Sequence, residues 1–215
     1  HKGIGQVQFW LVALTIGIAA GGATSLFRIG INQLETLVYG ADDMGLVSHA
    51  VFLPWYWILC VPIVGGLIVG IILHLFTPDG RARSVAQVIR GAALTGGRVE
   101  GKAGLASAFA SMITLSMGGS AGREGPVVHL GAVLSSKVSR WLNADAITGR
   151  NLMGCAAAAA VSASFNAPIA GTLFALEVVL RHYAVQAFAP IVIASVAGSI
   201  VSRLVFGDFV EFALP

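Results

Sequence analysis

The sequence predicts an all-α, polytopic membrane protein built from tilted and broken transmembrane helices. Hydrophobic residues make up 56% of its 215 residues and charged residues only 11%, with a mean hydropathy of +0.84. Ordinary soluble domains carry roughly 25% charged residues, so this composition lies far outside their range. Apolar stretches of about 20 residues, the length a helix needs to cross a hydrocarbon core, recur along the chain. We therefore expect a single transmembrane domain over residues 1–215, without a cleavable signal peptide.

The small excess of basic residues does not indicate a nucleic-acid-binding protein. The formal net charge is +3, but the basic residues fall mostly in one loop and at the ends of apolar segments, without interleaved aromatic residues. They are better explained as signals of membrane topology. The two cysteines, Cys60 and Cys155, lie in apolar surroundings without metal-binding or redox spacing. We therefore expect buried thiols and no cofactor.

The first two apolar segments predict complete membrane crossings. Residues 7–37 exceed the length of a perpendicular crossing, which predicts a tilted or projecting helix with Arg28 and Glu35 at its water-exposed end. The second span covers residues 51–76, and the aromatic run WYW near its start is typical of a membrane interface. Within it, Gly66 and Gly70 form a G-x-x-x-G pattern that favours close helix contact.

Residues 77–102 form the one basic loop, which is expected to contain a short helix. The loop carries five cationic residues: Arg81, Arg83, Arg90, Arg98 and Lys102. The positive-inside rule places such a loop in the cytoplasm, so the acidic stretch YGADDMGLVSH between the two spans is external. Ser84 followed three positions later by Gln87 matches the capping-box pattern, which predicts that the short helix starts there.

From residue 103 to residue 205 the apolar segments are short and interrupted. The stretches MGGSAGREGP, NADAITGRN and SFNAPIAG separate pieces of about 15 to 20 residues, often shorter than a full crossing. Non-helical backbone at membrane depth is tolerated only where it is buried in protein or lines a wet cavity. This pattern is typical of transporters and channels, in which helix N-termini point at a substrate near the membrane midplane.

Two of these interruptions predict helix starts that would share a site with Ser84. Pro126 fits the first turn of a helix beginning in GREGP, where the glycines leave backbone N–H groups uncovered. Asn166 is a favourable N-cap for another helix, with Pro168 in its first turn. Helix N-termini carry roughly half a positive charge and unpaired N–H donors, so several of them can bind an anion without a full cation. The backbone expected around the anion is that of Gly122, Arg123, Gly125 and Pro126.

Glu124 is the main candidate for a functional acid. Of the ten acidic residues, only Glu124 and Glu177 are expected at membrane depth, where an ionisable side chain costs about 2.5–3.5 kcal/mol. A carboxylate at a helix N-terminus is stabilised by the same N–H groups that would bind an anion. We therefore expect Glu124 to compete with the anion and to leave on protonation, as gate and proton acceptor, with Arg123 as its structural or electrostatic partner.

Less specific explanations compete with these assignments. A first-turn glutamate is also common as a capping charge, and Glu177 can face water or pair with Arg181, which makes it the weaker candidate. His129 has no third ligand nearby and no H-E-x-x-H motif, so we expect no metal. Two alternatives to transport stay open: an intramembrane hydrolase with Glu124 and His129 as acid and base, which lacks a nucleophile, and a non-conducting membrane scaffold.

The stretches GSAGREGPVVHLGA and AAAAAVSASFNAPIAGTLFALE resemble the CLC family of chloride channels and proton/chloride antiporters. The resemblance covers essentially the whole chain but only the first half of a family member, which consists of two inverted halves with the pore between them. It implies a homodimer that moves chloride or a similar anion, and possibly protons, across the inner (plasma) membrane. It also implies that Glu124 is the gating glutamate and that Phe165, Asn166 and Pro168 open another pore-side helix.

Two departures from the family pattern concern the mechanism. The family's G-S-G-I-P-like stretch contacts the anion through a serine at the intracellular pore mouth, and the equivalent position falls at Arg83, next to Ser84. Many exchangers carry a proton-transfer glutamate immediately after the position matched by Glu177, where this chain has Val178. The resemblance implies anion transport and leaves both a channel and a proton-coupled exchanger open.

Overall fold

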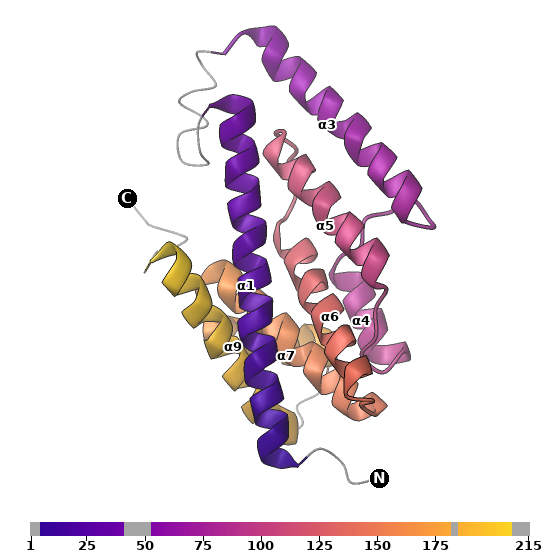
Figure 1. The fold of residues 1–215 in the computed structure, drawn as a ribbon, viewed down its shortest axis with the longest axis vertical. Coiled ribbons are helices and arrows are strands. Elements are labelled where there is room, and N and C mark those ends of the chain that lie inside the picture. The colour runs from indigo at the N-terminus through magenta and orange to yellow at the C-terminus, as the bar shows by residue number, and fades with distance from the viewer. Residues whose placement is uncertain (1–4, 41–52, 182–184, 208–215) are drawn as a thin grey trace.

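The described part of the chain is entirely helical. The computed structural model describes residues 5–40, 53–181 and 185–207, and it contains no strand within them (Figure 1). The helices are α1 (Gln6–Tyr39), α3 (Trp55–Phe76), α4 (Val85–Leu94), α5 (Gly101–Ser116), α6 (Glu124–Trp141), α7 (Ala146–Phe165), α8 (Pro168–Phe174), the π-helix η1 (Ala175–Leu180) and α9 (Val185–Phe206). The acidic stretch predicted to be external lies mostly outside the described residues.

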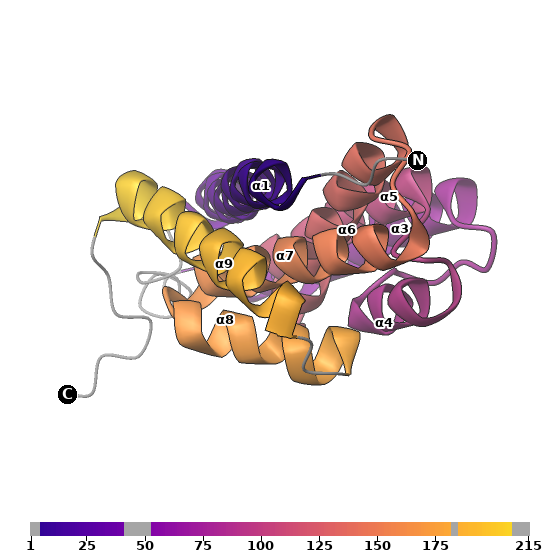
Figure 2. The ribbon, with the colours of Figure 1, turned by 90° about the horizontal axis from the view of Figure 1, so that it is seen from below.

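Helix α7 forms the centre of the bundle and packs against α1, α6, α8 and α9 (Figure 2). Its alanine run, residues 156–160, is fully buried. Small residues let the neighbouring backbones approach closely: a Cβ atom at Gly198 of α9 would lie 2.5 Å from the Ala159 carbonyl oxygen, and one at Gly171 of α8 would lie 2.5 Å from that of Ala158. Such contacts hold helices together in lipid, where the hydrophobic effect does not drive their association.

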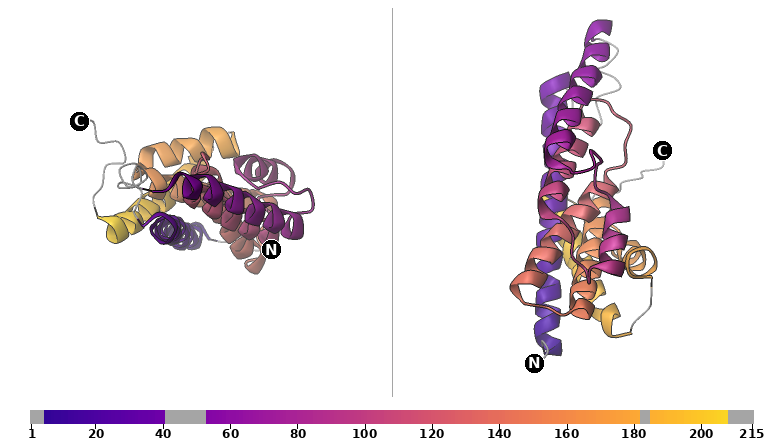
Figure 3. Two further views of the ribbon diagram at one scale, coloured as in Figure 1. Left: turned by 90° about the horizontal axis from the view of Figure 1, so that it is seen from above. Right: turned by 90° about the vertical axis from the view of Figure 1, so that its right-hand side faces the viewer.

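Helix α1 runs along most of the length of the molecule, and α3 extends beyond its upper end (Figure 3). It has 34 residues, so it is about 51 Å long at the α-helical rise, well beyond a hydrocarbon core of about 30 Å. Helices α1, α3 and α9 are each long and apolar enough to cross a membrane. The predicted first span, residues 7–37, lies within α1, and α3 covers residues 55–76 of the predicted second span.

The expected water-exposed end of the first span is only partly right. Glu35 is 6% exposed and therefore buried in protein, although it lies in the last turns of α1. The Arg28 guanidinium stacks over the Phe206 ring of α9, with 4.8 Å between its carbon and the ring centroid. Helix α1 packs against α5, α6, α7 and α9, and the sequence of α1 alone does not show those neighbours.

Helix α3 stands at the edge of the bundle and contacts α5 (Figures 1 and 3). The close contact is made by Gly65, where a Cβ atom would lie 2.6 Å from the Met117 sulfur. A Cβ atom at Gly66 or Gly70 would meet no other described atom within 4 Å, apart from the neighbouring residues and backbone of its own helix. The G-x-x-x-G pattern therefore does not form the predicted close contact within the described part of this chain.

Two adjacent glycines of α1 test the backbone contact between α1 and α9. A Cβ atom at Gly21 would lie 2.8 Å from the Gly198 Cα atom, whereas nothing lies within 4 Å of one at Gly22. We expect Gly21→Ala to destabilise the protein by about 1–3 kcal/mol, the usual cost of overpacking. Gly22→Ala is the matched control and is expected to be neutral or stabilising by up to about 1 kcal/mol, through helix propensity. Thermal unfolding of the full-length protein in detergent checks this, and equal effects of the two variants would refute the contact.

Candidate anion site at two helix starts

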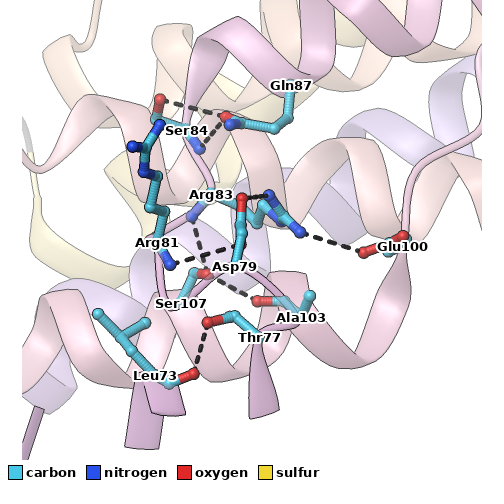
Figure 4. Close-up of polar contacts among 10 residues, drawn as sticks. All are labelled: Leu73, Thr77, Asp79, Arg81, Arg83, Ser84, Gln87, Glu100, Ala103 and Ser107. Carbon is cyan, nitrogen blue, oxygen red and sulfur yellow. Dashed lines mark hydrogen bonds and ion pairs between the residues drawn. The ribbon is translucent and has the colours of Figure 1, made fainter. Parts of the chain in front are cut away.

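Helix α4 begins at the predicted cap. Ser84 is the N-cap residue with extended backbone, and its N–H group donates to the Gln87 side-chain oxygen at 2.8 Å (Figure 4). The predicted helix start is therefore confirmed, with the Gln87 half of the capping box formed and no cap hydrogen bond from the Ser84 side chain. Because Gln87 satisfies the cap residue itself, the N–H groups of the first turn, Val85 and Ala86, have no acceptor within the helix. They are the donors that this helix start can offer to an anion.

Helix α6 begins at Glu124, inside the GREGP stretch, as expected. Arg123 is its N-cap residue, and Pro126 occupies the first turn, where a missing N–H group costs no helical hydrogen bond. The Glu124 side chain is half-buried, and a Cβ atom at Gly122 would lie 2.9 Å from its Oε2 atom. The carboxylate therefore lies beside the chain segment that leads into its own helix, next to the helix N-terminus.

The starts of α4 and α6 lie side by side. A Cβ atom at Gly125 would lie 3.4 Å from the Ser84 Cβ atom, in van der Waals contact with it. One turn further along, Val88 of α4 and Val128 of α6 are fully buried in one apolar cluster, and they hold the two helices together. Two helix N-termini, each equivalent to roughly half a positive charge, thus meet, and one of them carries Glu124 in its first turn.

The Arg83 guanidinium, a predicted anion contact, is engaged by two carboxylates. It forms ion pairs with Asp79 at 2.9 Å and with Glu100 at 3.4 Å, and its side chain is 14% exposed (Figure 4). Desolvation opposes the ionisation of Asp79, but the Arg81 N–H group and the Arg83 guanidinium together hold the pKa of Asp79 below its ordinary value. Since these acids neutralise Arg83, it does not add a full positive charge at the helix starts.

Ser107 fixes the backbone just before the cap, a role that sequence reasoning missed. Its hydroxyl accepts a hydrogen bond from the Arg83 N–H group at 2.8 Å and donates one to the Ala103 carbonyl at 2.7 Å (Figure 4). Ser107 is almost fully buried in α5. The only signal in the sequence is a serine within an alanine-rich apolar helix, and this signal does not name its partner.

The predicted second pore-side helix start requires a correction. Phe165 is the last residue of α7, and Asn166 is the C-cap of α7 in the left-handed conformation, with φ 53° and ψ 37°. Helix α8 starts at Pro168, with Ala167 as its cap residue, so the N-cap role predicted for Asn166 is wrong. Asparagine tolerates left-handed backbone better than most residues, which suits it to ending a helix.

The Asn166 side chain instead ties the break between α7 and α8 to α9. Its Oδ1 atom accepts hydrogen bonds from the Ser199 hydroxyl at 2.8 Å and from Arg203 Nε at 2.7 Å. The Pro168 carbonyl accepts another from the Ser195 hydroxyl at 2.7 Å. The start of α8 therefore lies against α9, whereas Phe165 packs on the apolar cluster below the starts of α4 and α6.

The remaining candidate residues, Glu177 and His129, differ in their exposure to solvent. Glu177 and Val178 are both exposed on η1, between the buried Leu176 and Val179. His129 is 2% exposed, and a Cβ atom at Gly104 of α5 would lie 2.8 Å from its Nε2 atom. Within the part of the chain that the structure describes, no group of three or more His, Cys, Asp or Glu residues could hold a metal ion.

Residues 65–215 match the family model described as voltage gated chloride channel. The chain belongs to this family. Members of this family are channels and transporters and not enzymes, so the match does not favour the hydrolase alternative. The match indicates a membrane protein, and it agrees with the family resemblance of the GREGP and FNAP stretches.

Relatives of known sequence are about one-third identical to the chain over the aligned residues. A putative chloride channel protein, ClcB-like, from Ralstonia nicotianae is 33% identical over 208 residues, which are 95% of this chain and 48% of that protein. The voltage-gated ClC-type chloride channel ClcB of Escherichia coli is 32% identical over 201 residues, 91% of this chain and 47% of its own length. The chain thus spans about half the length of the curated relatives it matches.

Two solved structures have the same fold. A slow cyanobacterial Cl⁻/H⁺ antiporter superposes with a TM-score of 0.77 at 20% identity, over 96% of this chain and 48% of that one. A CLC-type fluoride/proton antiporter superposes with a TM-score of 0.69 at 26% identity, over 97% of this chain and 49% of that one. The arrangement of broken helices around α7 is therefore that of half a CLC-type membrane protein.

Substitution of Asn166 tests its structural role. Asn166→Gly keeps the left-handed backbone but loses two hydrogen bonds, one of them to a charged group, and is expected to cost about 2 kcal/mol. Asn166→Ala loses the same bonds and adds the strain of left-handed backbone, about 1 kcal/mol more. Thermal unfolding of the full-length protein measures the order of stability of the two variants. Ser199→Ala is the control, because it removes only one of the two hydrogen-bond donors to Asn166. Equal stability of the Asn166→Ala and Asn166→Gly variants would contradict the assignment.

Proposed function

We propose that the full-length protein moves chloride or a similar monovalent anion across the inner (plasma) membrane, through a pore that passes the helix starts at Ser84 and Gly125. The carrying observation is that the two starts lie side by side, with 3.4 Å between the Ser84 Cβ atom and a Cβ atom placed on Gly125, and that Glu124 stands in the first turn of α6. The printed functions of the relatives, chloride channel and Cl⁻/H⁺ antiporter, support the choice of anion.

In this proposal the anion and the Glu124 carboxylate occupy the helix starts by turns. The N–H groups of the first helical turns stabilise either negative group. The carboxylate oxygens and the halide ion both accept hydrogen bonds from these groups and are attracted by the same partial positive charge. With the carboxylate bound, the anion is excluded, and protonation of Glu124 removes its charge and frees the site. The pairing of Arg83 with Asp79 and Glu100 supports this exchange, because an unneutralised cation would hold the anion too tightly to release it.

The described helices form one part of the proposed pore. We propose that the chain is the N-terminal half of the pore domain, with spans at 7–37 and 51–76, a cytoplasmic loop at 77–102 and pore-forming helices at 103–205. A second, inverted block of helices completes the pore, and the functional unit is a homodimer. The half-length match to both relatives and solved structures supports this arrangement.

Proton coupling is decided by measuring two fluxes in one preparation. Val178 stands at the position where the family's exchangers carry an internal proton-transfer glutamate, and Glu177 is exposed beside it. The full-length protein is reconstituted into liposomes with a chloride gradient across the membrane. If it is an exchanger, the downhill movement of chloride drives protons in the opposite direction. Chloride flux without proton movement identifies a channel.

Removal of the Glu124 carboxylate tests the gate. Flux through the wild-type protein is expected to rise as external pH falls, because protonated Glu124 no longer competes with the anion. Glu124→Ala is expected to conduct at every pH, without this dependence. Chloride efflux from liposomes, recorded between about pH 4.5 and 7.5, is the measurement, with Glu177→Gln as the matched control that keeps the wild-type profile. A Glu124→Ala protein with the full pH dependence would rule out the gate.

Gly125→Ala tests the site between the helix starts separately from the gate. The added methyl group would contact Ser84 without a severe clash and would take up space that the anion needs. We expect the protein to fold and anion binding to weaken by about tenfold, equivalent to about 1.4 kcal/mol. Isothermal titration with chloride measures this, and unchanged affinity would place the anion elsewhere.

A further inference from the structure

A second positively charged site lies beside α4, in a cleft of about 450 Å³. Its charged lining consists of Arg83, Arg90, Arg98 and Glu100, with Gln87 on its wall and His129 of α6 in its floor. Neither Ser84 nor Gly125 lines the cleft, so it is distinct from the junction of the two helix starts. The cleft belongs to the basic loop that the positive-inside rule assigns to the cytoplasm.

Two of its three arginines carry uncompensated charge. Arg83 pairs with Asp79 and Glu100, but Arg90 and Arg98 are exposed and form no ion pair among the residues that the structure describes. The Gln87 side-chain oxygen accepts from the Ser84 N–H group, which leaves the Gln87 NH₂ group as a donor. The cleft therefore offers several donors and an excess of positive charge.

His129 lines the cleft from α6 but offers it no donor. The residue is 2% exposed, and both ring nitrogens lie below the protein surface, beside Gly104 and the Ser84 backbone. The donors that a ligand in the cleft can reach are therefore those of Arg90, Arg98 and Gln87.

We propose that this cleft binds a phosphoryl group, carried either by a small cytoplasmic phosphate ester or by an anionic lipid headgroup. The planar forks of Arg90 and Arg98 match the oxygens of phosphate, and both side chains line the same cleft. A group with several acceptor oxygens suits such forks better than a monatomic anion does. The volume falls in the range of small-molecule sites.

The test measures binding to the full-length protein and does not depend on anion flux. Inorganic pyrophosphate is titrated by calorimetry into the protein in neutral detergent. Phosphatidic acid is tested separately, as retention by the protein in phosphatidylcholine nanodiscs. Arg90→Gln and Arg98→Gln are expected to weaken binding by about tenfold or more each. Arg81→Gln removes the same charge from the same exposed loop, outside the cleft lining, and is expected to bind as the wild type does.

A further variant separates specific binding from general charge attraction. Glu100→Gln removes the carboxylate that competes for the arginines and is expected to tighten binding. Pyrophosphate binding identifies a soluble ester as the source, and retention of phosphatidic acid alone identifies a lipid headgroup. Binding of neither, or equal weakening by Arg81→Gln, would overturn the proposal.

Discussion

Direct contact between helix backbones around α7 is the interaction on which the rest of the structure depends. Gly17 and Gly21 of α1 meet Ala194 and Gly198 of α9, and Gly198 in turn meets the alanine run of α7. Broken helices expose backbone N–H and C=O groups, and in a bilayer these survive only inside protein. The small residues bring α1, α8 and α9 close enough around α7 to bury the breaks. Without that packing, the ends of α4, α6 and α8 would have no fixed positions.

The candidate anion site depends on the partial charges of helix N-termini, although a full cation, Arg83, lies next to it. Arg83 directly precedes the α4 cap, yet Asp79 and Glu100 neutralise it, and Ser107 holds its backbone. The charge left at the junction of α4 and α6 is then mainly that of the two helix N-termini, together with Glu124. In the proposed function, such a site binds an anion weakly enough to release it, which transport requires more than affinity. The basic cleft beside it has the opposite character, with exposed guanidinium groups suited to a ligand that remains bound.

Each break in the helices has a different stabilising feature. At the start of α4 a glutamine satisfies the cap, and at the start of α6 a proline removes an N–H group that no helical acceptor would reach. At the end of α7 an asparagine adopts left-handed backbone and accepts two hydrogen bonds from α9. The first two interactions lie within a few residues of sequence. The third joins segments that are distant in sequence, and this difference decides which of them could be predicted.

The sequence by itself determined the features that depend on composition and on neighbouring residues. A helical membrane protein follows from the apolar content, because the cost of burying charge in lipid is a property of the side chains. The capping box at Ser84 and the helix start at GREGP follow from hydrogen bonds within one turn. Only the tertiary structure decided that Glu35 is buried, that Arg83 is neutralised, that Asn166 ends α7, and that Ser84 lies against Gly125. Each of these depends on a partner from another helix, and helix packing, not local chemistry, chooses that partner.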